Sequence, residues 1–191
     1  MDYLFIIIIS YLLGSIPFGL LLTKFILKKD IRKIGSGNIG ATNVLRSGNK
    51  FVAYTTLLLD ILKAIIPVLY IKFNYSDFIY IAALSVFLGH VFPIWLKFKG
   101  GKGVASYLGI LFSLNFFYGV VFSITWILIF LISRYSSLSS LIGSFSIPLY
   151  LFFIKGDQII FFGIMFILIF YTHRENIKRL INKEESKTKI Y

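Results

Sequence analysis

Three short polar segments interrupt an otherwise apolar chain, and they contain the residue types that bind phosphate in proteins. The segments are Gly35–Gly48, Phe98–Gly103 and Thr172–Arg179. Glycine exposes backbone N–H groups, and arginine and lysine add positive charge, so both can hold phosphate oxygens. Each segment lies beside a hydrophobic run that is long enough to enter a bilayer. If all three share one side of a membrane, the sequence predicts a phosphate site at the membrane surface.

The first segment begins with the string G-x-G-x-x-G at positions 35–40, which is also found in dinucleotide-binding turns. Here it follows a basic loop after an apolar run rather than a strand, so we exclude a dinucleotide site. We interpret it as an anion-binding loop, in which glycine N–H groups approach an anion and Arg46 grips phosphate oxygens in a bidentate way. Ser36 and Asn43 are its further polar candidates. A flexible loop is the alternative, but it does not explain these polar side chains.

The second segment resembles half of a nucleotide-binding P-loop. The full string G-x-x-x-x-G-K-[ST] is not met, because glycine stands at position 103 and leucine at position 96, so we do not predict nucleotide hydrolysis. What remains is Lys102 in a glycine turn directly before an apolar run, which places a lysine and free N–H groups at a helix N-terminus. The glycines of this turn are Gly100, Gly101 and Gly103. A basic cluster that only stops membrane transfer is the alternative.

Two further positions carry side chains suited to acid–base chemistry or substrate contact. His173 and Asn176 are three residues apart at the end of the last apolar run, so a helix would present both on one face. Ser137 and Ser140 share a face if a helix has already begun in the segment Arg134–Ser140, and they could line a cleft. The sequence does not decide which of these two serines contacts a substrate.

Some polar residues in the apolar runs favour a structural interpretation. His90 is near the end of a run, where a polar contact between helices is the more common role. Asp60 and Lys63 are three residues apart inside another run, where charges are unfavourable in lipid. We expect them to pair with each other or with another polar segment and to shape the helix bundle.

Composition identifies the class of protein. The chain has 191 residues, of which 58% are hydrophobic and 15% charged, and it has no cysteine. Disulfide and thiol chemistry are therefore excluded, and an integral helical bundle without a separate soluble domain is predicted. No cluster of carboxylates at ligand spacing is present, so no metal site is predicted. The apolar runs are Tyr3–Thr23, Phe51–Ile71, Phe78–Leu96, Val104–Ser133, Leu138–Ile154 and Gln158–Thr172.

The run Val104–Ser133 decides the number of spans. As one helix its 30 residues would be about 45 Å long, which is more than a bilayer requires; a break at Asn115 would give two spans. Seven spans with the N-terminus outside place 17 basic residues on the cytoplasmic side and 2 outside, whereas six spans give 11 and 8. The positive-inside rule therefore favours an all-α protein with seven transmembrane helices and a cytoplasmic C-terminus.

Taken together, the motifs resemble those of the bacterial membrane acyl-phosphate:glycerol-3-phosphate acyltransferases. The resemblance covers nearly the whole chain and includes several long, ordered strings. They are Gly14–Gly19, Ser36–Arg46, Asp60–Lys63, Gly89–Pro93, Phe98–Ala105, Arg134–Ser140 and Thr172–Ile177.

The resemblance implies one transmembrane acyltransferase domain over residues 1–191, in the bacterial inner membrane, with its active site on the cytoplasmic side. Such an enzyme transfers a fatty acyl group from acyl phosphate to the sn-1 hydroxyl of glycerol 3-phosphate and needs no cofactor, coenzyme A or metal. Its partners are its two substrates and membrane lipids but no nucleic acid. The sequence leaves the oligomeric state open, with a monomer as one alternative. By position, His173, Ser36 and Asn176 would be catalytic. Substrate would contact Arg46, Asn43, Lys102, Gly100, Gly101, Gly103, Ser137 and Ser140.

Two other classes of function are compatible with a basic protein of many spans. A transporter or channel for an organic phosphate would need polar groups continued through the membrane, whereas the polar residues here gather at the ends of the apolar runs. A non-catalytic membrane scaffold explains the spans but not the glycine–cation segments. The sequence therefore favours the enzyme.

Overall fold

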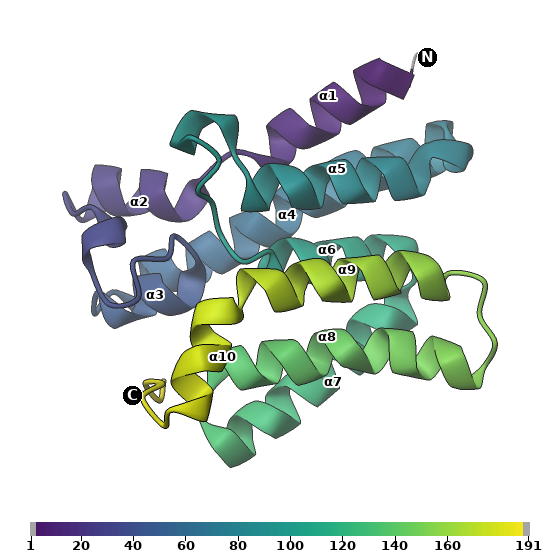
Figure 1. Ribbon diagram of the computed structural model, residues 1–191. Coiled ribbons are helices and arrows are strands. Elements are labelled where there is room, and N and C mark those ends of the chain that lie inside the picture. Colours follow the sequence, from purple (N-terminus) through teal and green to yellow (C-terminus); the bar gives the residue numbers. More distant parts are fainter. Residues whose placement is uncertain (1–2, 189–191) are drawn as a thin grey trace. The chain divides into compact units, whose positions relative to one another are not determined.

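The computed structural model describes residues 3–188, and all regular structure among them is helical (Figure 1). The chain divides into two compact units, residues 1–114 and residues 115–191. In the described part, five helical stretches are long and apolar enough to cross a membrane. A sixth forms if α9 (Ile159–Thr172) and α10 (Arg174–Ile181), which meet at a 62° bend, count as one span. The predicted all-helical class with several membrane spans is confirmed.

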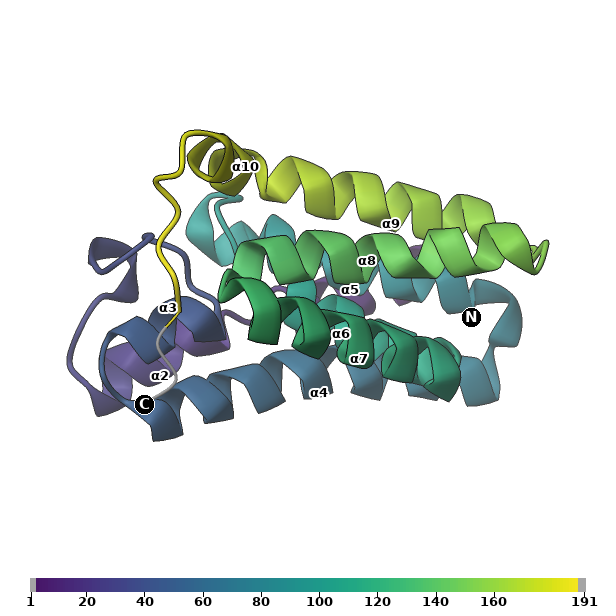
Figure 2. The same ribbon diagram turned by 90° about the horizontal axis from the view of Figure 1, so that it is seen from below.

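Unit 1 is built around its longest helix. Its helices are α1 (Tyr3–Gly14), α2 (Phe18–Ile26), α3 (Ala41–Arg46), α4 (Lys50–Asn74), α5 (Ile79–Val91) and α6 (Val104–Leu114), with 3₁₀ turns η1 (Ile31–Lys33), η2 (Ser76–Phe78) and η3 (Ile94–Leu96). Helix α4 packs against the other five α-helices of this unit, and α1 also packs against α5 (Figure 2). The position of α4 therefore determines how the polar segments of unit 1 are held.

The first apolar run is interrupted, which the sequence prediction of a single helix over Tyr3–Thr23 did not anticipate. Helix α1 ends at Gly14 and α2 begins at Phe18. Pro17 causes the break, because proline lacks a backbone N–H and disfavours helical geometry in the preceding residue. The backbone oxygen of Ile16, inside the break, accepts a hydrogen bond from Lys63 Nζ at 2.7 Å.

Helices α1 and α5 approach each other closely through two glycines. A Cβ atom added to Gly14 would overlap the backbone oxygen of Val86, and one added to Gly89 would overlap the backbone oxygen of Tyr11. Small residues allow this approach of backbones in membrane helices, where packing rather than the hydrophobic effect drives association. The two glycines thus fix the distance between α1 and α5.

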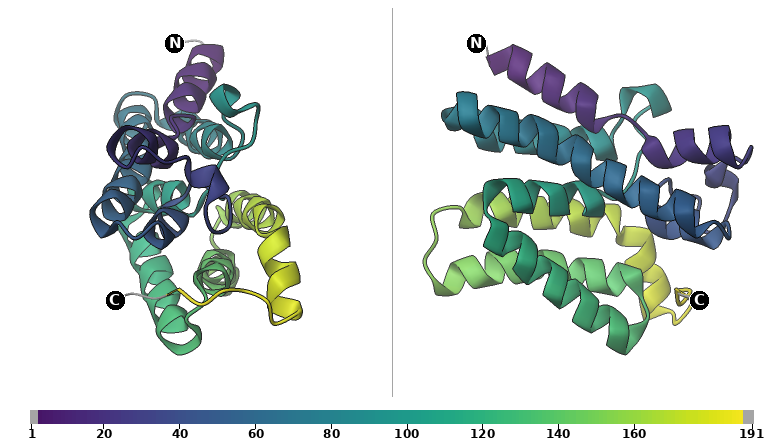
Figure 3. Two further views of the ribbon diagram at one scale, coloured as in Figure 1. Left: turned by 90° about the vertical axis from the view of Figure 1, so that its left-hand side faces the viewer. Right: turned by 180° about the vertical axis from the view of Figure 1, so that it is seen from behind.

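Unit 2 contains four helices in its described part: α7 (Phe116–Ser133), α8 (Ser136–Phe153), α9 and α10. Helix α8 packs against the other three (Figure 3). The turn between α7 and α8 and the bend between α9 and α10 lie at the same end of this unit, where the backbone N–H of Thr188 donates to the oxygen of Arg134 at 3.0 Å. The polar segments of unit 2 therefore gather at one end.

The predicted break at Asn115 and the predicted pairing in α4 are both confirmed. Helix α6 ends at Leu114 and α7 begins at Phe116, and the Asn115 side chain caps α7 by accepting the N–H of Phe117 at 2.9 Å. Lys63 Nζ lies 2.7 Å from Asp60 Oδ1. Helix α6 has only 11 residues and falls short of the length of an ordinary span, so seven spans stay a prediction.

We expect Gly14→Val to destabilise the protein. The added side chain has no room against the backbone of Val86, and such overpacking costs about 1–3 kcal/mol. Thermal unfolding of the protein in detergent measures the effect. Gly163→Ala is the matched control, because nothing lies within 4 Å of a Cβ at this α9 position. Equal unfolding temperatures for the two variants would contradict this account of α1–α5 packing.

Candidate functional site

The Asn43 side chain holds the loop that joins α2 to α3. The two N–H groups of its amide face three backbone oxygens, those of Ile31 at 3.2 Å, Ile34 at 2.9 Å and Asn38 at 2.7 Å from the nitrogen, so one N–H is shared between two acceptors. Its Oδ1 accepts the backbone N–H of Ser36 at 2.9 Å. The carboxamide that the sequence assigned to substrate binding is therefore used in holding the loop in place.

Glycine at two positions of this loop is explained by the backbone. Gly35 and Gly37 have φ values of +55° and +71°, which L-residues with a side chain rarely adopt. A Cβ at Gly35 would also overlap Asn43 Oδ1 and lie 3.2 Å from Arg46 Cδ. The loop thus passes directly against Asn43 and Arg46, and Ser36 next to it is exposed.

The loop and its surroundings carry a large excess of positive charge. Between residues 24 and 50 there are seven basic residues and one acid, Asp30. Arg32 binds Asp30 in a bidentate way, with Nε–Oδ1 and Nη2–Oδ2 distances of 2.9 and 2.6 Å. The hydrogen bond from Arg32 holds the pKa of Asp30 well below its usual range, so the pair stays ionised. The remaining cations favour an anionic ligand or surface.

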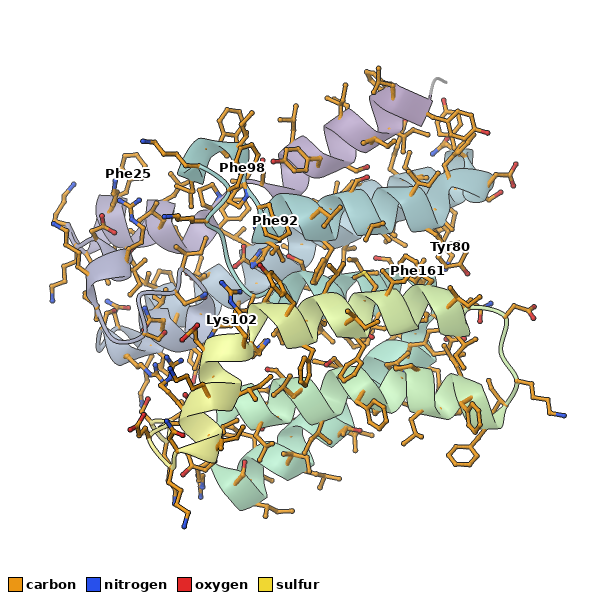
Figure 4. All side chains as sticks on the ribbon, viewed as in Figure 1. Phe25, Tyr80, Phe92, Phe98, Lys102 and Phe161 are labelled. Atoms are coloured by element: carbon orange, nitrogen blue, oxygen red, sulfur yellow. The ribbon has the colours of Figure 1, made fainter. Side chains whose placement is uncertain are left out.

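The glycine turn between α5 and α6 carries Lys102 (Figure 4). Its Gly100 and Gly101 N–H groups, which the sequence assigned to anion binding, instead donate to the backbone oxygens of Val91 and His90 at 3.0 and 3.1 Å. Gly103 has φ +86° and leads directly into α6. The groups of this turn that suit an anion are therefore Lys102 and the first N–H groups of α6, which have no acceptor within the helix.

The turn and the α2–α3 loop are connected within unit 1. Leu96, in the segment before the turn, packs against the apolar cluster beneath the loop, whose members include Ile31, Ile39 and Val44. The segment before the turn and the α2–α3 loop therefore pack against the same apolar cluster.

In unit 2, His173 lies at the bend between α9 and α10, with only 2% of its surface exposed. Its Nδ1 is 2.8 Å from the backbone oxygen of Ile169. A backbone oxygen only accepts hydrogen bonds, so Nδ1 carries the proton, and in the neutral ring the lone pair is on Nε2. The bend therefore fixes the tautomer of a potential general base.

Asn176 and Ser137 share one carboxylate, which the sequence analysis did not predict. Both donate to Glu185 Oε1, each at 2.8 Å, and Arg179 Nε donates to Glu185 Oε2 at 2.8 Å. Burial opposes the charge on Glu185, but the hydrogen bonds from Arg179, Asn176 and Ser137 outweigh it and lower its pKa. The Glu185 side chain, 6% exposed, is thus a charged anchor for two predicted site residues.

Ser140 has different neighbours from Ser137, although both lie in α8. Its hydroxyl donates to the Ser136 backbone oxygen at 2.8 Å and accepts from Trp126 Nε1 at 3.1 Å. Because α8 begins at Ser136, the condition under which the two serines share a helix is met. The structure brings Ser137, but not Ser140, into direct contact with the group that binds Asn176.

Sequence reasoning therefore missed Glu185 and Trp126. Glu185 lies in a C-terminal segment of mixed charge, where five basic residues follow position 177 before the last residue at 191. The sequence offers only charge there, and no spacing that points to α8. Trp126 is one aromatic residue among many in an apolar run.

Comparison with known proteins identifies a matching family model and close relatives of the chain. A family model described as glycerol-3-phosphate acyltransferase matches residues 4–183. A glycerol-3-phosphate acyltransferase of Pelagibacter ubique is 71% identical and the alignment covers 100% of both chains. One of Bartonella henselae is 52% identical, covering 95% of this chain and 90% of the relative.

Two crystal structures of PlsY, an integral membrane glycerol 3-phosphate acyltransferase, are also similar. The glycerol 3-phosphate form has a TM-score of 0.90 and 39% identity, covering 97% of this chain and 94% of that one. The lysophosphatidic acid form has a TM-score of 0.87 and 38% identity, with the same coverage. The resemblance predicted from the motifs is confirmed, and the chain belongs to the glycerol-3-phosphate acyltransferase family.

Proposed function

We propose that this protein transfers a fatty acyl group from acyl phosphate to the sn-1 hydroxyl of glycerol 3-phosphate. The products are lysophosphatidate and inorganic phosphate, and the reaction is the first step of phospholipid synthesis. Relatives that match over nearly the whole chain are named glycerol-3-phosphate acyltransferases, and the solved relative has forms with glycerol 3-phosphate and with lysophosphatidic acid. The choice of acyl phosphate as donor follows from the resemblance of the motifs to those of the acyl-phosphate:glycerol-3-phosphate acyltransferases.

We further propose that residues 1–191 act as one domain of seven transmembrane helices in the bacterial inner membrane. The N-terminus would be outside and the C-terminus and active site cytoplasmic, as the distribution of basic residues favours. Helix α6 would be a short seventh span and α9 the last, with α10 on the cytoplasmic side. A monomer in contact with membrane lipids suffices, without a cofactor.

In this proposal the basic segments of unit 1 hold the two anionic substrates. Acyl phosphate and glycerol 3-phosphate repel each other, so bringing them together requires positive charge. Arg46, Lys102 and the first turn of α6 supply it, and Ser36 adds an exposed hydroxyl. Asn43 and the glycines of the Lys102 turn act by giving their segments the required shape.

The observation that carries the proposed chemistry is the fixed tautomer of His173. With Nδ1 bonded to Ile169, Nε2 can accept a proton from the sn-1 hydroxyl. The hydroxyl oxygen attacks the acyl carbon, an ester bond forms, and the bond from the acyl carbon to the bridging phosphate oxygen breaks. Phosphate leaves, and the proton on His173 passes to it or to solvent. Because acyl phosphate is already activated, orientation supplies much of the rate, roughly 7–11 kcal/mol in favourable cases.

Asn176 is proposed to orient the attacking hydroxyl. It is 4% exposed, and its Oδ1 accepts no hydrogen bond from the described residues. Glu185 fixes the other end of the same carboxamide, so that Oδ1 is the end left to bind a substrate hydroxyl. Ser137, held by the same carboxylate, and Ser140 complete the polar groups assigned to substrate in this unit.

The direct test supplies purified protein with labelled glycerol 3-phosphate and a long-chain acyl phosphate, and in parallel with acyl-CoA. We expect lysophosphatidate and an equal amount of phosphate from acyl phosphate alone. Product from acyl-CoA would contradict the proposed donor. No product from either donor, in protein shown to be folded, would contradict the enzyme; uptake of substrate into proteoliposomes would then favour a transporter.

We expect His173→Ala to lower turnover by roughly 10²–10⁴-fold, the usual contribution of general base catalysis. Steady-state kinetics with both substrates measures it. Arg174→Gln is the matched control, because Arg174 is the exposed neighbour of His173 and stacks on the Tyr171 ring with 4.6 Å between the guanidinium carbon and the ring centroid. Turnover near that of the wild type in His173→Ala would contradict the proposed role of this residue as general base.

We expect Glu185→Gln to remove a pH-dependent part of the stability. Because the pKa of Glu185 is lowered in the folded protein, its charge contributes fully above the ordinary value of 4.5 and loses this contribution as the pH falls through the folded pKa. The difference in unfolding temperature between wild type and variant should therefore shrink below pH 4.5. Glu184→Gln, at the exposed neighbouring position, should show no such change. A constant difference for Glu185→Gln at every pH would refute this role of the charge.

A further inference from the structure

The imidazole of His90 lies directly against the glycine turn that carries Lys102. A Cβ added to Gly101 would overlap His90 Nε2 and lie 2.9 Å from both His90 Cδ2 and Cε1. His90 is 4% exposed and Gly101 is buried as well. The imidazole is thus packed directly against Gly101, the residue before Lys102.

The backbone of the turn is fastened to the same end of α5. Gly100 and Gly101 donate their N–H groups to the Val91 and His90 oxygens, at 3.0 and 3.1 Å. The chain reaches this position through two residues with positive φ, Lys97 at 51° and Phe98 at 61°. Such a conformation is unfavourable for residues with a side chain and persists only where surrounding contacts hold it. The contacts with α5 therefore determine where the turn lies.

His90 itself is backed by the buried ion pair of α4. Its Nδ1 is 3.8 Å from Asp60 Oδ1, and Asp60 Oδ1 is 2.7 Å from Lys63 Nζ. Asp60 also contacts α6, because its backbone oxygen accepts a hydrogen bond from Ser106 Oγ at 3.3 Å. The imidazole therefore sits between a charged pair on one side and Gly101 on the other.

We propose that His90 is a positioning residue, which acts through Gly101 to place Lys102 for the phosphate of a substrate. The inference rests on the proposed function, since Lys102 is assigned to substrate there. A purely structural polar contact between helices, the role that the sequence favoured, does not account for the fit of the ring to a position where only glycine has room. Loss of the ring leaves a space beside Gly101, so the turn and Lys102 become less well placed.

The experiment is a mutant cycle between His90 and Gly101. Gly101→Ala alone adds a methyl group where the imidazole lies, and His90→Ala alone opens a space there. In the double variant the added methyl group occupies part of the vacated space, so each substitution should partly correct the other. Residues in contact are coupled whatever their role, so the readout decides between the two roles. A general structural role predicts that only the unfolding temperature recovers, whereas positioning predicts that kcat/KM and the exchange of the turn recover as well.

Two readouts are measured on the full-length protein in detergent, alongside its unfolding temperature. The first is hydrogen exchange of the backbone amides of residues 97–104. The second is kcat/KM for acyl phosphate at saturating glycerol 3-phosphate. We expect faster exchange and an about 10- to 100-fold lower kcat/KM in each single variant, the size of loss that follows from misplacing a substrate-binding group. The double variant should recover at least about tenfold over Gly101→Ala, by the same estimate.

His90→Asn is made in parallel, because it keeps a polar group beside Asp60 and serves if His90→Ala does not fold. Exchange and kcat/KM at wild-type levels in His90→Ala or His90→Asn would overturn the proposal, as would a double variant no better than Gly101→Ala. The exchange readout does not depend on catalysis. An inactive wild type would therefore refute the proposed function alone, while exchange in the variants still decides the role of His90.

Discussion

The ion pair between Asp60 and Lys63 connects α4 to the α1–α2 break and to α5, and it lies within an apolar helix. Lys63 donates to the backbone oxygen of Ile16 in the break between α1 and α2, and the Asp60 carboxylate lies 3.8 Å from His90 Nδ1 of α5. The backbone oxygen of Asp60, outside the ion pair, accepts from Ser106 of α6. Charges inside a membrane protein are unfavourable unless they are paired and hydrogen-bonded. Removal of one partner would leave the other as a buried, unpaired charge. The pair therefore opposes any movement of the helix ends that would separate its two members.

In unit 2 a carboxylate that follows the last helix, Glu185, connects segments in a similar way. The Glu185 carboxylate holds Ser137 of α8 and Asn176 of α10, and Arg179 neutralises it. In unit 2 two side chains proposed to meet substrate, Ser137 and Asn176, are thus held by hydrogen bonds to one carboxylate. Catalysis by orientation requires this kind of support, because a small displacement of a binding group loses much of the advantage.

Much of the fold could be predicted from the sequence, because apolar runs, charge distribution and helix-breaking residues act locally. The break at Asn115 and the Asp60–Lys63 pair are examples. The shared face of Ser137 and Ser140 was expected only if a helix had begun, and α8 does begin at Ser136. The break before Pro17 was missed because hydropathy continues without change across it. The motifs also indicated the family correctly.

The candidate site was less predictable, because it depends on contacts between residues distant in the chain. Asn43 and the N–H groups of Gly100 and Gly101 have the right chemistry for an anion, yet the structure uses them to hold backbone. Nothing in the spacing of residues shows that Glu185 reaches α8 or that His90 meets Gly101. Residue types suggested which chemistry is possible, whereas tertiary contacts decide which of the groups remain for it.

The most direct test of the central claim follows the bridging oxygen of the acyl phosphate donor. The substrate is labelled with ¹⁸O at this oxygen and incubated with the protein and glycerol 3-phosphate, and the products are analysed by mass spectrometry. Attack on the acyl carbon predicts that the label leaves in inorganic phosphate, with one lysophosphatidate formed for each phosphate released. Label retained in a free fatty acid, or phosphate release without lysophosphatidate, would contradict direct acyl transfer.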